Sequence, residues 1–119
     1  MVLGAGDVAW VELNPTLGTE QAGRRPGLIL SDAGYNERTG RVLVCPITRS
    51  PRPWTFHVPI PPGLKVEGMV MVDQVRMLDG RLRVFDYVDT LPAATLAEVR
   101  GRLANLAGIL VGTDLGSFE

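Results

Sequence analysis

Hydrophobic residues recur at every second position along much of the chain, which is typical of β-strands that bury one face. The run over residues 41–47 differs, because it is apolar at nearly every position and therefore predicts a strand buried on both faces. Pro46 has no N–H to donate to a neighbouring strand, so we place it at the end of this run. The six predicted strands cover residues 7–13, 26–32, 41–47, 54–60, 68–75 and 81–88.

Turn-forming residues separate these strands. They predict a loop over 14–26, a turn-rich connection over 33–40, a proline-punctuated loop over 48–53 and a turn over 61–64.

A helical period is found only near the C-terminus. Apolar residues recur there at steps of three and four, forming one stripe of Leu96, Val99, Leu103, Leu106 and Leu110. Pro92 suits the first turn and Thr90 suits the cap just upstream, while Gly101 weakens the middle by about 1 kcal/mol relative to alanine. The fold class is therefore mainly β: a small, strongly bent barrel or paired sheet with a closing C-terminal helix.

The bulk composition describes one globular domain over residues 1–119, with its core over about 6–111 and a frayed tail over 112–119. One cysteine, Cys45, excludes an internal disulfide, and the single His57 argues against a zinc site of the usual kind. No signal peptide and no apolar stretch of about 20 residues is found, so we expect a cytoplasmic protein.

Charge is unevenly distributed along the chain. Residues 20–57 hold six arginines against three acidic residues, whereas the rest holds six basic and ten acidic residues. A basic half would suit an anionic ligand, although an ordinary mixed surface explains the same numbers.

The boundary between the first loop and the second strand carries the most suggestive chemistry. Arg25 lies where the loop meets the strand, and Glu20 precedes it on the same loop. A carboxylate can move a proton while a guanidinium binds a phosphate through two hydrogen bonds, a pairing suited to phosphodiester chemistry. A surface ion pair is the alternative. Thr48 follows the buried strand and could present a fixed hydroxyl, or simply cap a turn.

Longer motifs frame these residues. They are Gly6-Asp7-Val8-Ala9-Trp10-Val11, Asn14-Pro15-Thr16-Leu17-Gly18-Thr19-Glu20-Gln21-Ala22-Gly23-Arg24-Arg25-Pro26, Val44-Cys45-Pro46-Ile47-Thr48 and Gly68-Met69-Val70-Met71-Val72-Asp73-Gln74-Val75-Arg76. Through them the chain, over about residues 6–110, resembles the MazF/PemK family of toxin endoribonucleases from type II toxin–antitoxin systems.

The resemblance implies a PemK/CcdB-type, SH3-like barrel and a homodimer that cuts single-stranded RNA at a short preferred sequence. It implies a reaction without metal or cofactor, leaving 2′,3′-cyclic phosphate and 5′-hydroxyl ends. It also implies inhibition by a MazE-like antitoxin with an acidic tail.

Carried over by motif, the resemblance implies that Arg25 and Thr48 are catalytic, with Glu20 as the natural base for the 2′-hydroxyl. RNA contacts are expected from Thr16, Gln21, Arg24, Arg49, Arg52, Trp54 and Gln74. His57 is expected on a sheet face without a catalytic role, and Phe56 in the core. Two alternatives remain: a toxin of the same fold that binds DNA gyrase, and a barrel that binds RNA without cutting it.

Overall fold

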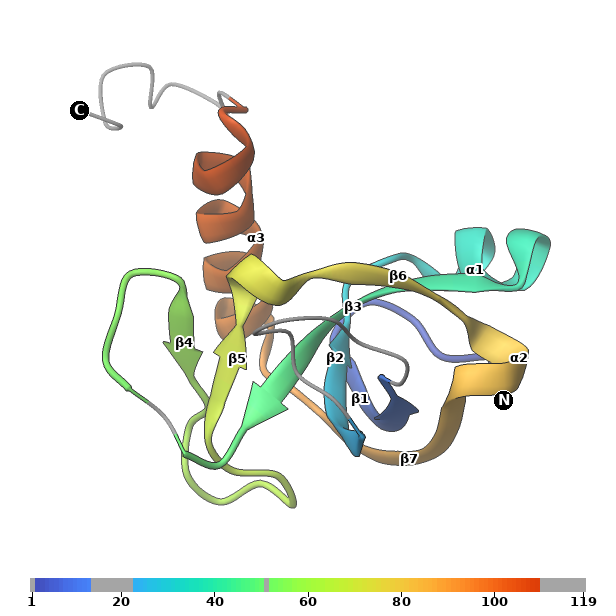
Figure 1. Cartoon of the computed structure of the whole chain (residues 1–119), viewed down its shortest axis with the longest axis horizontal. Coiled ribbons are helices and arrows are strands. Elements are labelled where there is room, and N and C mark those ends of the chain that lie inside the picture. The colour runs from blue at the N-terminus through green and yellow to red at the C-terminus, as the bar shows by residue number, and fades with distance from the viewer. Residues whose placement is uncertain (1, 14–22, 51, 110–119) are drawn as a thin grey trace.

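A computed structural model describes residues 2–13, 23–50 and 52–109, in which antiparallel strands dominate and helices fill the connections (Figure 1). The elements in chain order are β1 (Asp7–Glu12), β2 (Arg24–Ile29), α1 (Ala33–Thr39), β3 (Arg41–Thr48), β4 (His57–Pro59), β5 (Met69–Met71), the 3₁₀ helix η1 (Val72–Gln74), β6 (Arg76–Asp79), α2 (Gly80–Arg83), β7 (Val84–Thr90) and α3 (Ala93–Ala107). No helix in these ranges is long and apolar enough to cross a membrane.

The strands form one bent antiparallel sheet in the order β4-β5-β3-β2-β1-β7. The long strand β3 holds it together, because β6 pairs with its first half and β5 with its last two residues. In the described part of the chain, β4 and β7 do not pair with each other, so the sheet stays open although β6, α2 and β7 curl around it (Figure 1).

Strand β3 separates two hydrophobic cores, as its continuous apolar run predicted. Cys45 and Ile47 belong to the larger core, which also receives Val99 of α3. Val42 and Val44 belong to the smaller core, which Leu78 of β6 helps to fill. Both faces of β3 are therefore buried, and its position in the molecule is strongly fixed.

The C-terminal helix begins and ends close to the predicted residues, although its caps differ. Pro92 is the N-cap residue, and Gly108 closes the helix in the left-handed conformation. The prediction of Thr90 as the cap is wrong: it is the last residue of β7, and its hydroxyl donates to Asp7 at 2.8 Å. Val99 is fully buried, but Leu106 is 44% exposed because the last turns of α3 extend beyond the sheet (Figure 1).

The prediction of turns over residues 33–40 is also wrong, because this connection contains helix α1. This helix carries no apolar stripe that would predict it, because Asn36 is its only buried residue. The Asn36 amide donates to the backbone oxygens of Leu3 and Ser31, and Gly40 ends the helix with φ of 72°.

Three predicted strands are shorter than their apolar patterns suggest. The run over 68–75 is interrupted by η1. Before η1 the chain pairs with the end of β3 as β5, and after η1 it pairs with the beginning of β3 as β6. The run over 81–88 begins as α2, because the Asp79 carboxylate accepts hydrogen bonds from the N–H groups of Arg81 and Leu82. The run over 54–60 is a strand only at His57–Pro59.

An acidic side chain fixes the loop between β4 and β5. Asp89 of β7 accepts a hydrogen bond from the Lys65 N–H at 2.9 Å, and its other oxygen accepts from the Thr90 N–H at 2.8 Å. The hydrogen bond from Lys65 has the largest effect and that from Thr90 the next, and both lower the pKa of Asp89 below its ordinary value.

We expect this contact to make stability depend on acid. Because the pKa of Asp89 is lowered in the folded protein, its contribution is full above the unfolded value of about 3.9 and is lost as the pH falls through the folded value. Urea unfolding of the wild type and Asp89→Asn should therefore differ most near neutral pH and converge below about pH 4. A constant difference at every pH would contradict this role.

Candidate active site

One large cavity of about 830 Å³ opens between the start of β2 and the end of β3. We call it the arginine cavity, because Arg24, Arg25, Arg49 and Arg52 line it and none of its described lining residues is acidic. The remaining described residues around it are Trp10, Pro26, Ile47, Thr48, Ser50, His57, Met71 and Gln74. Such a cavity favours a polyanion.

Strand register explains why residues far apart in sequence share this cavity. Across three strands, Pro59 pairs with Met69 and Met69 with Thr48, while His57 pairs with Met71. Paired residues and alternate residues of a strand lie on the same face, so Thr48, Met71 and His57 face the same way. The intervening residues, including Val70 and Ile47, belong to the larger core on the opposite face.

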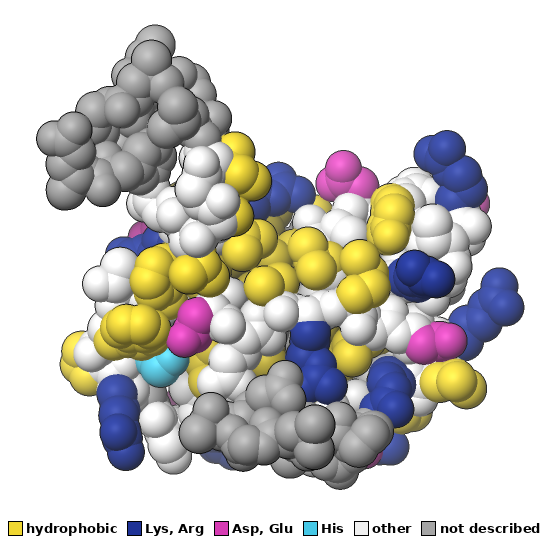
Figure 2. Space-filling view, turned by 45° about the horizontal axis from the view of Figure 1, so that its top comes forward, with side chains coloured by type: hydrophobic (Ala, Val, Ile, Leu, Met, Phe, Trp, Pro, Cys, Tyr) yellow, Lys and Arg dark blue, Asp and Glu magenta, His cyan; other side chains and the backbone are white. Residues whose placement is uncertain are grey.

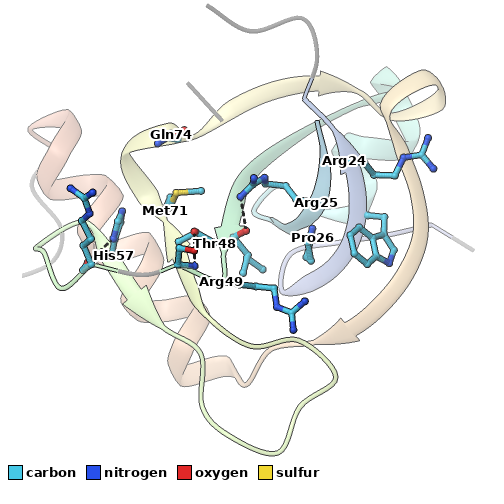
Figure 3. Close-up of a pocket in the computed structure, with 12 residues that line it drawn as sticks. Arg24, Arg25, Pro26, Thr48, Arg49, His57, Met71 and Gln74 are labelled. Carbon is cyan, nitrogen blue, oxygen red and sulfur yellow. Dashed lines mark hydrogen bonds between the residues drawn. The ribbon is translucent and has the colours of Figure 1, made fainter. Parts of the chain in front are cut away.

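Arg25 reaches into the cavity from β2, pointing toward Thr48 (Figure 3). Its Nη1 donates a long hydrogen bond of 3.5 Å to the backbone oxygen of Ile47, the residue before Thr48. Its Nε is buried and has no hydrogen-bond partner among the described residues. A buried donor that lacks a partner is costly, and an oxyanion is a suitable acceptor for it.

Thr48 is held rigidly at the end of β3. Its side chain is buried, with the residue only 7% exposed, and its Oγ1 accepts a hydrogen bond from the Ser50 N–H at 3.1 Å. The hydroxyl proton therefore remains available to a ligand in the cavity. The backbone of Gly68, at φ of 122°, packs so closely against β3 that an added Cβ would lie 2.0 Å from the backbone oxygen of Thr48.

His57 also lines the cavity, on the sheet face where the sequence placed it. Its Nδ1 lies 2.8 Å from the backbone oxygen of Arg52, and because a carbonyl only accepts, Nδ1 carries the proton. In the neutral ring, Nε2 is then the acceptor. Trp54 packs edge-on against this ring and against Phe56 and does not line the cavity; Phe56 packs on the larger core, as predicted.

The other predicted arginines occupy different parts of the cavity. Arg24 stacks its guanidinium 3.9 Å from the ring centre of Phe85, at the side of the cavity (Figure 3). Arg49 extends away from Arg25 and pairs with Glu67 at 3.4 Å. Arg38 and Arg41 of the same basic half lie outside the cavity lining, and Figure 2 shows Lys and Arg side chains gathered near α1 and α2.

Three predicted site residues, Thr16, Glu20 and Gln21, lie outside the described residues. Gln74 is described and lines the cavity from η1. Trp10 was not predicted as a site residue, yet it lines the cavity from β1 and is 40% exposed. A tryptophan amid the alternating pattern of a strand was the available signal, but only the pairing of Trp10 with Pro26 brings it to this site.

Cys45 is excluded as a nucleophile by its environment. Burial raises the pKa of its thiol to about 12, and the negative charge of Asp73 adds to the rise. Among the described residues, no group of three His, Cys, Asp or Glu side chains could hold a metal ion.

The chain matches known proteins along most of its length. Residues 5–107 match the family described as PemK-like, MazF-like toxin of type II toxin-antitoxin system. The endoribonuclease toxin MazF of Escherichia coli K12 is 34% identical over 103 residues, which cover 87% of this chain and 92% of that protein.

Solved structures agree with this match. The crystal structure of MazF from Deinococcus radiodurans is 43% identical with a TM-score of 0.88, covering 92% of this chain and 99% of that one. A MazE–MazF crystal structure from the same organism gives 42% identity, a TM-score of 0.82 and the same coverage. The chain therefore belongs to the PemK-like, MazF-like family of toxins of type II toxin–antitoxin systems.

Proposed function

We propose that this protein is an endoribonuclease that cuts single-stranded RNA in the arginine cavity. The observation that carries the proposal is the half-buried Arg25 side chain, which donates to the residue before Thr48 and whose buried Nε has no partner among the described residues. A scissile phosphate placed there would receive hydrogen bonds from Arg25 and from the Thr48 hydroxyl. The names of relatives such as the E. coli MazF endoribonuclease support this interpretation.

The reaction that fits these groups is attack by the RNA itself. The ribose 2′-oxygen forms a bond to phosphorus as the bond to the 5′-oxygen breaks, giving a 2′,3′-cyclic phosphate and a free 5′-hydroxyl. Glu20 accepts the 2′-hydroxyl proton in this proposal, and a proton is returned to the leaving oxygen. Arg25 and Thr48 stabilise the charge that grows on the non-bridging oxygens, so the mechanism routes no step through a metal ion.

The remaining lining residues would hold the RNA on either side of the cut. Arg24, Arg49 and Arg52 offer charge to flanking phosphates, and Gln74 offers an amide to a base edge. We assign RNA contacts to Thr16 and Gln21 by their place in the family motif. Trp54 lies just outside the lining, packed edge-on against His57, and its exposed surface is assigned a contact to RNA that extends beyond the cavity.

Two partners follow from the same proposal. Hydrophobic side chains form a band across the face seen in Figure 2, which is typical of a surface covered in a homodimer. Met77, Leu106 and Ile109 are among the exposed large hydrophobic residues of the chain. A MazE-like antitoxin is the second partner, as in the D. radiodurans MazE–MazF structure. Its acidic tail would compete with RNA for the four arginines of the cavity.

We expect the wild type to cut a long single-stranded RNA in the presence of EDTA and to leave cyclic phosphate ends. Thr48→Val should lower kcat about 100-fold because it removes the hydroxyl and keeps the shape, whereas Thr48→Ser should retain most activity. End-group analysis and single-turnover rates measure both results. A folded wild type that leaves RNA intact would contradict the proposal and make gyrase inhibition the next assay.

A further inference from the structure

A second, smaller cavity lies beside the arginine cavity and shares part of its wall. We call it the side pocket; Trp10, Pro26, Leu64, Val88, Arg49 and Glu67 line it, and its volume is about 300 Å³. Trp10, Pro26 and Arg49 also line the arginine cavity, so one ligand can occupy both. Its volume lies at the lower end of the range for ligand pockets and suits a single planar group.

The chemistry of the side pocket combines a stacking surface with a charged rim. The indole of Trp10 is partly exposed, and Pro26, Leu64 and Val88 supply apolar surface. Arg49 and Glu67 form an ion pair of 3.4 Å at the rim, with side chains that are 77% and 82% exposed. A pair so exposed is weak, which leaves the Glu67 carboxylate free to accept a hydrogen bond from a ligand.

The fold holds this pocket in place before any ligand arrives. Leu64 and Glu67 flank Lys65, whose N–H is bound by the Asp89 carboxylate of β7 at 2.9 Å. Val88, the neighbour of Asp89, forms part of the pocket. The loop therefore cannot move away from β7 without breaking this hydrogen bond, and the pocket is preformed to that extent.

We infer that the side pocket binds one unpaired base of the RNA, next to the phosphate held by Arg25 and Thr48. The base stacks on Trp10, while Glu67 accepts a hydrogen bond from an exocyclic amino group. Every base offers at least one N–H to a carboxylate, but only guanine presents two adjacent donors, its N1–H and its exocyclic amino group. Lys65, which also lines the pocket, can donate to the O6 of the same base. The pocket therefore favours guanine at one position. This inference rests on the proposed function and names a determinant of its sequence preference.

The test is the base composition around each cut in a randomised single-stranded RNA pool. The wild type should favour guanine at one position, and Glu67→Gln should reduce that preference about tenfold while preferences elsewhere persist. Trp10→Ala should raise KM about tenfold, and Trp10→Phe should restore most of the loss because it keeps an aromatic face. Glu37→Gln is the matched control, since Glu37 is exposed on α1 and lines neither cavity.

Three results would overturn the inference in different ways. A wild type that cuts RNA, with Glu67→Gln keeping its full preference at every position and Trp10→Ala its KM, would leave the proposed function standing and remove the base pocket. The base pocket is equally ruled out if these variants lose only their inhibition by an antitoxin, because the pocket would then belong to that protein partner. A folded wild type that cuts no RNA overturns the proposed function and this inference together.

Discussion

Replacing Arg25 with alanine is expected to lower RNA cleavage by about 100- to 1000-fold while leaving the protein folded. The guanidinium donates to the backbone oxygen of Ile47, the residue before Thr48, and its buried Nε is a donor that a phosphate oxygen would satisfy. Arg25→Lys should recover only part of the activity, because an ammonium keeps the charge but cannot present two parallel donors. The effect is measured as the single-turnover rate constant for cleavage of a defined RNA, with kcat and KM from steady-state rates on the same RNA.

The control for this experiment is Arg38→Ala, which removes an exposed arginine of α1 outside the cavity. It should change cleavage only slightly, and any change should disappear at higher salt because it reflects long-range attraction. Equal losses for Arg25→Ala and Arg38→Ala would mean that the cavity acts through net charge alone. The Arg25–Thr48 assignment would then be wrong.

Replacing Gly68 with alanine is expected to destabilise the protein by about 3 kcal/mol or more and to reduce cleavage as well. The backbone of Gly68 has φ of 122°, and a Cβ there would lie 2.0 Å from the backbone oxygen of Thr48. Relief requires β3 and β5 to separate at the Thr48–Met69 pair, which carries the proposed catalytic hydroxyl. Urea unfolding gives the loss of stability, and cleavage at low temperature reports on the site.

Gly63→Ala separates the cost of a positive φ from the cost of the clash with Thr48. Gly63 also has a positive φ, of 91°, but nothing lies within 4 Å of its added Cβ. Its cost should therefore be limited to backbone strain, about 1 kcal/mol, with cleavage almost unchanged. If both variants lost the same stability, the close approach to Thr48 would have no energetic importance.

The central part of the fold could be predicted from sequence because its signals are local. A continuous apolar run identified β3 as a strand buried on both faces, and a period of three to four identified α3. Helix α1 gave no such signal, since its stability depends on contacts of Asn36 with Ser31 and Leu3 rather than on an apolar stripe. The break at η1 was hidden because the apolar run continues through it.

The candidate site was predicted where chemistry and motif coincided, at Arg25 and Thr48, and the structure places both around one cavity. Trp10 was not predicted as a site residue, and His57 was predicted only to lie on a sheet face, because their positions at the cavity depend on strand register. Only the pairing of Trp10 with Pro26 and of His57 with Met71 reveals which face each presents. Pairing between distant strands cannot be read from the local sequence around either residue.

The placement of the reactive pair on β2 and β3 has an evolutionary consequence. Arg25 and Thr48, the proposed catalytic residues, belong to strands that are paired on both sides, so the backbone that positions them is strongly fixed. Arg49, Arg52 and Glu67 lie outside the strands, where substitutions cost little stability. Descendants of this chain can therefore acquire new target sequences by drift in their loops while the cutting reaction is inherited intact.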